Sequence, residues 1–459
     1  MLAPALVFIA SVAAALYWGR GAMRVLVAIA VMLAAVRGGL LVLAGDSGLS
    51  DPGLSVNALV PAIVAALVVG VLVRLRPTLD DLSRPLLIGW CVIAVIALVN
   101  FLVQTVGLKL YGIGLAQYLV YPTLALVVWP VMVEGDERRL TRVIIAASLL
   151  VAFTVMLQAS GIEDFVQSAN AEVDGLNANR YAGITGSYLH TSSFLGAAFV
   201  LIMGETMAAG NWRDRIIGVV MLAALFSAVI LTFSRSGVMI SVIGAAILFL
   251  FTGGSGSRRL RLIALVIPAI VVAVGIGALG GVTPEDAAER AASGLQTEGD
   301  LGNELRSNAI RDGIERYGDE TLLHQTLGNG LASTGNARQL DGGLDDAVIV
   351  ESYYLKVLTE TGMVGLILIG GFLVWSLVYF AWAIWRYREP QVASLAAAGI
   401  GLGLYNVIYP ALETQLLALV WWLLLSLSLR TTWLRSPAGT KFLFPLGGGK
   451  PDGDEPVGS

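Results

Sequence analysis

Cysteine and histidine are nearly absent from this chain. Cys91 is its single cysteine, and there are two histidines among 459 residues. A lone cysteine cannot close an internal disulfide or build a thiolate metal site, and two histidines are too few for a histidine-rich metal centre. We therefore expect neither a bound metal nor a cofactor.

Charge is scarce as well. Only 14% of the residues are charged, whereas about a quarter is usual for a soluble domain. Hydrophobic residues make up 56%, the mean hydropathy is +0.78, and apolar runs of about 17 to 20 residues recur along the chain. These runs lack the alternation, in segments of about ten residues, that is typical of a membrane β-barrel. The composition predicts an all-α polytopic membrane protein.

The apolar runs predict about thirteen transmembrane helices, within a range of about twelve to fourteen. They lie at roughly 2–18, 25–44, 57–73, 85–104, 111–133, 143–161, 188–209, 216–234, 237–252, 262–282, 351–380, 392–410 and 412–429. The first run has neither a basic segment before it nor an Ala-x-Ala cleavage pattern, and a second run follows at once. We therefore interpret it as a retained helix and not as a cleaved signal.

Arginines cluster in alternate connections between these runs. The clusters are Arg20 and Arg24; Arg74, Arg76 and Arg84; Arg138, Arg139 and Arg142; Arg213 and Arg215; Arg258, Arg259 and Arg261; and Arg386 and Arg388. The intervening connections are poor in basic residues. Because basic residues of short loops stay on the cytoplasmic side, we expect the N-terminus outside and the C-terminus inside.

Residues 283–350 form the one long polar segment, with thirteen acidic residues, five arginines and no lysine. The predicted orientation makes this segment an external, partly helical loop domain between the helices of 1–282 and those of 351–435. Thr283 and Pro284 are a helix start, and Asn303 can cap a second helix that runs to about Tyr317. Residues 324–346 are expected to form a shaped loop, and the tail 436–459 is expected to be disordered and cytoplasmic.

Two arginines at expected outer helix ends are candidate anion ligands. Arg235 lies in Ser234-Arg235-Ser236-Gly237 between two apolar runs, where an arginine requires a partner. Its planar guanidinium suits phosphate or pyrophosphate; a snorkelling arginine or a structural ion pair is the alternative. Arg180, in Asn179-Arg180-Tyr181, precedes another membrane entry and is a further candidate.

The second helix of the loop carries Arg306 and Arg311. A separation of five residues turns them about 140° apart, so they cannot share one narrow face. Arg311 and Glu315 are spaced for a surface ion pair, which leaves Arg306 as the preferred ligand.

Acid–base chemistry has two candidates. Glu351 opens the helix after the loop, where a carboxylate could act as a general base or simply favour the positive end of the helix. His324 is a second candidate base or substrate contact, although a lone loop histidine is more often incidental. Tyr354 lies in the same Glu351-Ser352-Tyr353-Tyr354 motif and is a candidate substrate-binding residue.

The order of these motifs resembles the O-antigen ligase / O-antigen polymerase superfamily of bacterial membrane glycosyltransferases. Arg180 and Gly183 precede a helix, Ser-Arg-Ser-Gly follows at a helix junction, and a large external loop contains Gly328-Asn329-Gly330. Then comes Glu-Ser-Tyr-Tyr-Leu…Thr-Glu-Thr-Gly-Met-Val-Gly-Leu over 351–366. The resemblance covers roughly 175–370.

This resemblance implies a metal-independent GT-C-like glycosyltransferase in the bacterial inner membrane. It would take a glycan from undecaprenyl pyrophosphate on the outer face. In ligases the position matching Glu351 is usually histidine followed by asparagine, and arginines matching Arg235 and one of Arg306 or Arg311 are essential. The Glu351-Ser352 pair departs from that pattern and favours a polymerase of O-antigen or exopolysaccharide repeat units.

The function we expect is therefore polysaccharide polymerisation, with Arg235, Arg306 and Arg180 neutralising the leaving pyrophosphate and Glu351 as the base. The expected partners are the lipid-linked glycan, a lipid-linked repeat unit and membrane lipid, with a chain-length regulator and a flippase as candidates and no nucleic acid. An O-antigen ligase acting on lipid A core and a protein O-oligosaccharyltransferase stay open. A transporter is the distant alternative, although we find no internal repeat of the kind that transporters carry.

Overall fold

The computed structural model describes residues 2–46, 52–75, 83–103, 107–161, 180–252, 301–335 and 352–435, and all regular secondary structure in these ranges is helical. The expected run at 262–282, the helix start at Thr283 and the tail 436–459 lie outside these ranges. Every other expected apolar run coincides with a helix or with consecutive helices.

The first half of the chain forms helices that follow one another with short connections. They are α1 (Leu2–Trp18), α2 (Arg20–Ala35), α3 (Arg37–Asp46), α4 (Pro52–Gly70), α5 (Ser83–Val103), α6 (Leu108–Leu115), α7 (Tyr121–Val131) and α8 (Asp136–Ala159). Two π-helical turns, η1 (Val71–Leu75) and η2 (Ala116–Val120), extend α4 and join α6 to α7.

The second half adds the helices that carry most of the candidate residues. They are α9 (Tyr188–Ala208), α10 (Trp212–Leu231), α11 (Arg235–Phe251), α14 (Leu301–Asp319), α15 (Leu322–Leu327), α17 (Tyr353–Gly365), α18 (Gly371–Tyr387), α19 (Pro390–Tyr405) and α20 (Gln415–Arg435). Short turns η3 (Gly183–Thr185), η4 (Leu366–Gly370) and η5 (Ala411–Glu413) complete them. The π-helical turn η4 joins α17 to α18, and α17 itself is kinked at Gly362, which has a φ of 68°.

Seven helical stretches in the described residues are long and apolar enough to cross a membrane, or eight if the bent pair α2–α3 counts as one span. The seven are Val56–Val73, Leu110–Val131, Asp136–Ala159, Tyr188–Ala208, Trp212–Leu231, Tyr353–Tyr387 and Gln415–Arg435. Shorter apolar helices lie within α1, α5 and α11. The chain is thus an all-α, multi-pass membrane protein.

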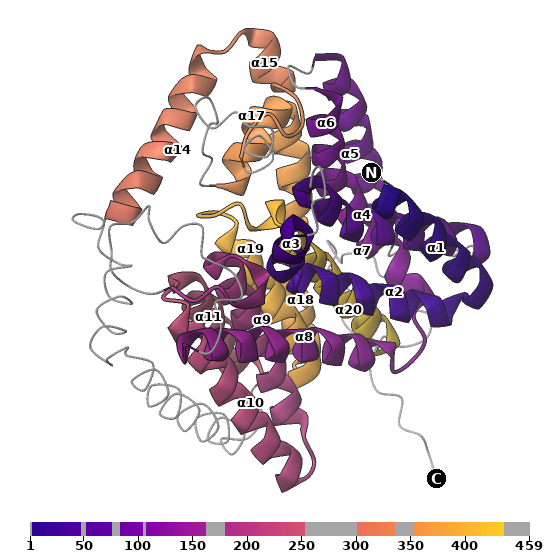
Figure 1. Cartoon of the computed structure of the whole chain (residues 1–459), viewed down its shortest axis with the longest axis vertical. Coiled ribbons are helices and arrows are strands. Elements are labelled where there is room, and N and C mark those ends of the chain that lie inside the picture. The colour runs from indigo at the N-terminus through magenta and orange to yellow at the C-terminus, as the bar shows by residue number, and fades with distance from the viewer. Residues whose placement is uncertain are drawn as a thin grey trace, which may run out of the picture.

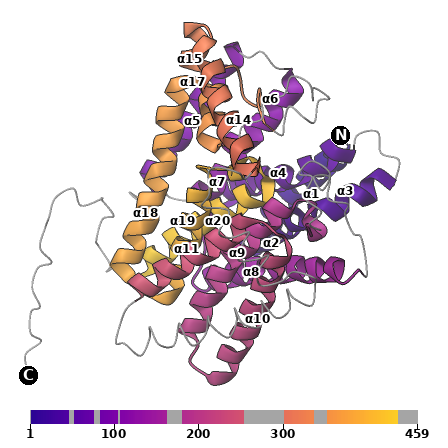
Figure 2. The same cartoon turned by 90° about the vertical axis from the view of Figure 1, so that its left-hand side faces the viewer.

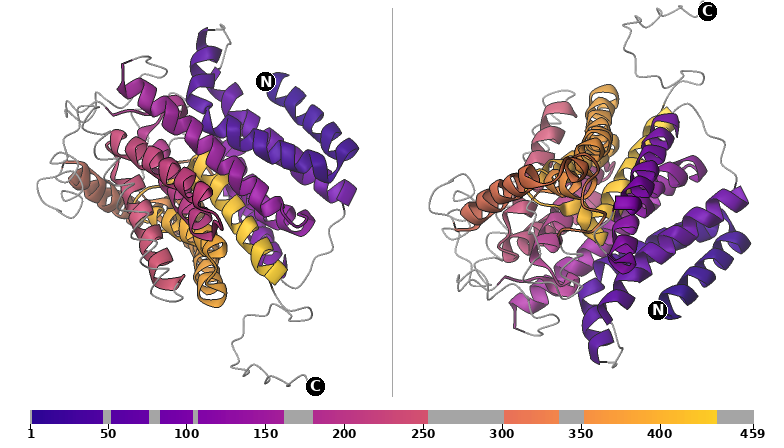
Figure 3. Two further views of the ribbon diagram at one scale, coloured as in Figure 1. Left: turned by 90° about the horizontal axis from the view of Figure 1, so that it is seen from below. Right: turned by 90° about the horizontal axis from the view of Figure 1, so that it is seen from above.

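Two helices form the centre of the bundle. The 18-residue apolar window of α20 is 94% buried and that of α9 is 83% buried. Helices α8, α10, α11 and α19 pack around α9, while α7, α18 and α19 pack on α20. Figure 3 shows α20 in yellow between the indigo N-terminal helices and the orange α17–α18. Since both faces of α20 are covered by protein, it carries almost no lipid-facing surface.

The helices α14 and α15 lie together at one extreme of the molecule (Figures 1 and 2). Helix α15 packs on α17 and α5, and Gly313 of α14 approaches Leu355 of α17. The Thr321 side chain caps α15 by accepting the N–H of His324. His324 is therefore helical, which differs from the expected loop beginning at that residue.

The segment after α15 turns back into the protein. Gly328, Gly330 and residues 331–335 are buried, and the Gly330 N–H donates to the Glu360 carbonyl at 3.1 Å. Gly328 has a φ of 81°, and a Cβ there would meet the backbone of Glu360. Glycine is needed here because of both the positive φ and the contact.

Candidate functional site

Helix α8 connects two polar ends of the molecule. Asp136 at its start lies 2.7 Å from the Nε atom of Arg24, and Gln158 near its end accepts the Gly183 N–H at 2.9 Å. These residues are 22 positions apart, which in a helix is about 33 Å, close to the thickness of a bilayer core. We call the Asp136 end the arginine-rich end and the Gln158 end the candidate-site end.

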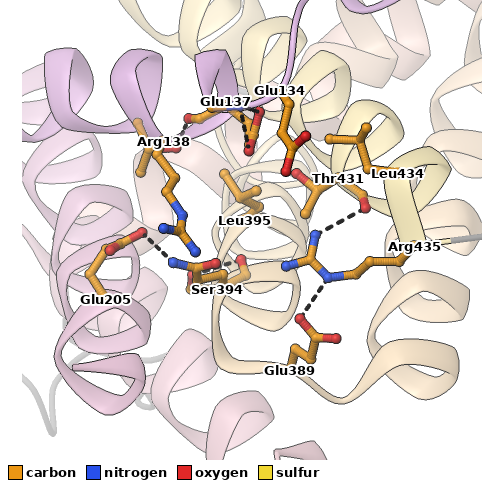
Figure 4. Close-up of a pocket in the computed structure, with 13 residues that line it drawn as sticks. Glu134, Glu137, Arg138, Glu205, Glu389, Ser394, Leu395, Thr431, Leu434 and Arg435 are labelled. Atoms are coloured by element: carbon orange, nitrogen blue, oxygen red, sulfur yellow. Dashed lines mark hydrogen bonds and ion pairs between the residues drawn. The ribbon is translucent and has the colours of Figure 1, made fainter. Parts of the chain in front are cut away.

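The arginine-rich end holds Arg24, Arg138 and Arg435, together with Glu205 of α9 and the α18–α19 connection. Arg435 Nε donates to Glu389 Oε2 at 2.6 Å, which ties α20 to the α18–α19 connection. A cavity of about 450 Å³ opens here (Figure 4), lined mainly by charged and hydroxyl side chains. Arg138 of α8 and Arg435 of α20 extend into it from opposite sides in Figure 4.

Carboxylates outnumber guanidinium groups around this cavity, four to two. Its ionisable lining consists of Glu134, Glu137, Arg138, Glu205, Glu389 and Arg435. The Glu137 carboxylate accepts the Gly135 N–H at 3.0 Å, so it stabilises the start of α8. No group of acidic, histidine or cysteine side chains suited to a metal occurs among the residues described. This cavity lies at the opposite end of α8 from Arg180.

At the candidate-site end, the segment Arg180–Gly186 is fixed by hydrogen bonds from three helices. Its Tyr181 N–H donates to the Leu231 carbonyl of α10 at 3.4 Å, and the Ile184 N–H donates to Thr154 Oγ1 of α8 at 3.1 Å. Arg180 itself is buried, and its Nη1 atom donates to the Tyr188 hydroxyl at 2.7 Å. The sequence-predicted Arg180 is therefore held rigidly at the start of α9.

Arg235 lies beside the same segment because α9 and α11 pack unusually closely. Ser192 Oγ donates to the Ser234 carbonyl at 3.2 Å, and Ser193 Oγ donates to Ser236 Oγ at 3.0 Å. A Cβ on Gly196 would lie 2.6 Å from the Gly237 carbonyl oxygen. Small residues thus let the two backbones meet, and Arg180 and Arg235, 55 positions apart in the sequence, come to the same end of this helix group.

A second group of polar side chains continues this end across the bundle. Arg37, at the first position of α3, donates from Nε to Asn57 Oδ1 at 2.6 Å. Gln415 at the start of α20 donates to the Asn57 carbonyl. His190 Nε2 lies 3.1 Å from the Tyr409 hydroxyl. These contacts join α3 and α20 to α4, and α9 to the segment between α19 and η5.

The most deeply buried charges lie next to this group. Lys356 and Glu360 of α17 form an ion pair with both side chains fully buried, and Lys356 Nζ lies 3.4 Å from Glu413 Oε1. Thr334 Oγ1 donates to Glu360 Oε1 at 3.0 Å, and Asn100 Nδ2 donates to the Glu360 carbonyl at 3.0 Å. We name Lys356, Glu360 and Glu413 the buried charge cluster. It joins α17, the turn η5 and the segment after α15.

The other sequence-predicted residues are spread over the α14–α17 region. Arg311 is exposed and donates to Asn308 Oδ1 at 3.0 Å, with no ion pair to Glu315 among the residues described. His324 Nδ1 lies 3.3 Å from Glu320 Oε2. Tyr354 is partly buried on α17. The structure does not group these three with Arg180 and Arg235.

Two predicted residues are outside what the structure describes. Glu351 precedes the described start at residue 352, and Arg306 belongs to α14 although its side chain is not among those described. Their predicted roles stay predictions.

Sequence reasoning missed Arg37 and the buried charge cluster. Arg37 lies inside the apolar run at 25–44, which the sequence predicts to be one uninterrupted helix. The signal that could have found it is the charge itself, since an intramembrane arginine marks a functional or paired site. Lys356 and Glu360 were detectable as a spacing of four inside an apolar stretch, whereas Glu413 required the tertiary structure.

The class of protein defined by fold and site is a multi-pass helical membrane protein with a polar layer at each end. No protein-family model matches the chain, and no curated protein shows significant similarity to it.

Proposed function

We propose that this protein is a polysaccharide polymerase of the O-antigen or exopolysaccharide type. It transfers a glycan from undecaprenyl pyrophosphate to a lipid-linked repeat unit on the outer face of the bacterial inner membrane. In this proposal about thirteen spans hold 283–350 outside, so that α14 and α15 belong to an external loop domain.

The observation that carries the proposal is the convergence of Arg180 and Arg235 at one end of α9 and α11. The hydrogen bonds of Tyr181 to Leu231 and of Ser192 to Ser234 make these two segments neighbours. Fixed guanidinium groups at a membrane boundary suit the phosphate oxygens of a lipid diphosphate. The motif order that resembles the superfamily supports the same reading.

In the proposed reaction an acceptor hydroxyl attacks the anomeric carbon of the donor sugar. The bond between that carbon and the pyrophosphate oxygen breaks, and undecaprenyl pyrophosphate leaves. Arg235, Arg180 and Arg306 stabilise the negative charge that develops on it. Glu351 takes the proton of the acceptor hydroxyl. Arg311, His324 and Tyr354 contact the glycan substrates.

A ligase acting on lipid A core is the second candidate, and a protein O-oligosaccharyltransferase is a third. The Glu351-Ser352 pair favours the polymerase over the ligase. A transporter is the alternative from a different class, and it would move substrate without forming a glycosidic bond.

The experiment is a polymerisation assay with purified lipid-linked repeat units. Glu351→Gln keeps the size of the side chain but cannot accept a proton, so polymer formation should fall roughly 10²- to 10⁴-fold while donor binding is kept. Glu351→His should restore part of the activity because imidazole is a base near neutral pH. A Glu351→Gln protein that polymerises at the wild-type rate would remove Glu351 from the mechanism.

A further inference from the structure

A sharp bend interrupts the second apolar run at Arg37. Helices α2 and α3 meet there at 71°, within what would otherwise be one span. The Leu40 N–H donates to the Val36 carbonyl at 3.1 Å, so α3 starts anew at the bend. A charged residue at the break of an apolar helix has a functional or structural cause.

The contacts of Arg37 leave most of its donors unused. Its Nε atom donates to Asn57 Oδ1 at 2.6 Å, which is a neutral amide. Within the described part of the chain no carboxylate pairs with Arg37, and no acceptor binds its Nη1 or Nη2 atom. A guanidinium has five N–H donors. Asn57 therefore orients Arg37 without neutralising it.

The first turn of α3 lies against the segment that carries Arg180. A Cβ on Gly38 would lie 2.6 Å from the Gly186 Cα atom, and a Cβ on Gly39 would lie 2.8 Å from Ile184 Cγ1. Only residues without a side chain allow this approach. Arg37 also lies within electrostatic range of Tyr121 and His190. Neither of these neighbours carries a negative charge near neutral pH.

We propose that Arg37 is a further ligand for the diphosphate of the lipid-linked donor and forms one anion site with Arg180 and Arg235. This inference rests on the proposed function and extends its site to α3. The bend puts the positive N-terminal end of α3 at the same place. The oriented, carboxylate-free guanidinium of Arg37 provides the paired donors that a diphosphate oxygen accepts.

The test uses inorganic pyrophosphate as the probe and the purified full-length protein in detergent. Wild type should bind pyrophosphate, and Arg37→Gln should raise its Kd roughly 10- to 100-fold. Arg37→Lys keeps the positive charge but loses the paired N–H donors of the guanidinium group, so its Kd should lie between those of wild type and Arg37→Gln. Arg139→Gln removes an exposed arginine at the arginine-rich end and should leave the Kd unchanged.

A purely structural role for Arg37 would lower the melting temperature of the ligand-free protein without changing the Kd. Equal pyrophosphate affinity in wild type and Arg37→Gln overturns the proposal, as does an absence of binding to wild type. A second measurement needs only the wild-type protein, so it does not depend on the folding of a variant. Bound pyrophosphate should protect Arg37 from modification by phenylglyoxal, which peptide mass spectrometry measures. Unchanged modification of Arg37 also overturns it.

These outcomes are separable from the failure of the proposed function. Arg37-dependent pyrophosphate binding without polymer formation from lipid-linked repeat units would keep the anion site and reject the polymerase. Polymer formation with normal activity and pyrophosphate affinity in Arg37→Gln would keep the polymerase and reject the role of Arg37.

Discussion

Lys356, Glu360 and Glu413 are three ionisable side chains with almost no solvent contact: the first two are fully buried and the Glu413 side chain is 2% exposed. The Lys356 ammonium group is therefore the counter-charge of both carboxylates. Breaking such a cluster costs far more than its net contribution to stability, because a buried charge without its partner is strongly unfavourable. The cluster holds the segment after α15 against α17 through Thr334.

Lys356→Met should destabilise the protein by about 3–5 kcal/mol, since it leaves two buried carboxylates without a counter-charge. The measurement is thermal unfolding of the purified variant in detergent. A triple variant that also carries Glu360→Gln and Glu413→Gln should recover most of the loss. A Lys356→Met protein as stable as wild type would contradict the buried ion pair.

Arg235→Lys should insert and fold normally but reduce polymer formation by at least about tenfold, because a point charge cannot replace the bidentate fork of arginine on a diphosphate. Polymer is measured per unit of membrane-inserted protein. Arg139→Lys is the matched control at the arginine-rich end. Wild-type polymer from Arg235→Lys would make Arg235 structural or incidental.

At the scale of elements, apolar runs predict where helices lie but not how they deviate from regularity. The run at 25–44 contains a 71° bend at Arg37, and the run at 351–380 continues through a π-helical turn at Leu366–Gly370. The first of these deviations depends on a tertiary contact. The bend at Arg37 requires the close contact between Gly38 and Gly186. These two residues are far apart in the chain, so the composition of a short stretch of sequence does not reveal their contact.

The sequence predicts those parts of the candidate site that depend on the charge of a single residue. Arg180 and Arg235 are rare charges at the ends of apolar runs, so charge alone identified them. Their juxtaposition depends on Ser192, Gly196 and Gly237, which are small residues without distinctive chemistry. Glu413 could not be found because its partner Lys356 is 57 positions away.

Gly237→Ala should force α11 away from α9, because the new methyl group would meet the backbone carbonyl of Ser192. We expect a loss of stability of about 1–3 kcal/mol and, since Arg235 lies two residues earlier, a parallel loss of activity. Gly371→Ala is the control, because nothing lies within 4 Å of its added carbon; it should be neutral or slightly stabilising. Equal effects of the two changes would contradict the close helix contact.

At the scale of the whole molecule, the charges divide between two ends about one bilayer thickness apart along α8. One end holds Arg24, Arg138, Arg435 and the charged cavity. The other collects Arg37, Arg180, Arg235 and the buried charge cluster. The orientation predicted from the arginines places the first end in the cytoplasm. The side of the membrane on which each end lies can be measured.

A cysteine at Leu322, which is 80% exposed on α15, should react with a membrane-impermeant maleimide in intact cells with a permeabilised outer membrane. The background carries Cys91→Ser, so the chain has no other thiol. Arg139→Cys, exposed at the arginine-rich end, should react only after the inner membrane is lysed. The reverse pattern would invert the orientation.

The central claim is that each glycosidic bond is made at the expense of a lipid diphosphate. The most direct measurement counts undecaprenyl pyrophosphate released by the purified protein in proteoliposomes supplied with undecaprenyl-pyrophosphate-linked repeat units and a metal chelator. We predict one released carrier for each new glycosidic bond, with lengthening glycan chains on the remaining carrier. Movement of the intact lipid-linked unit across the bilayer with neither carrier release nor chain growth would contradict the account.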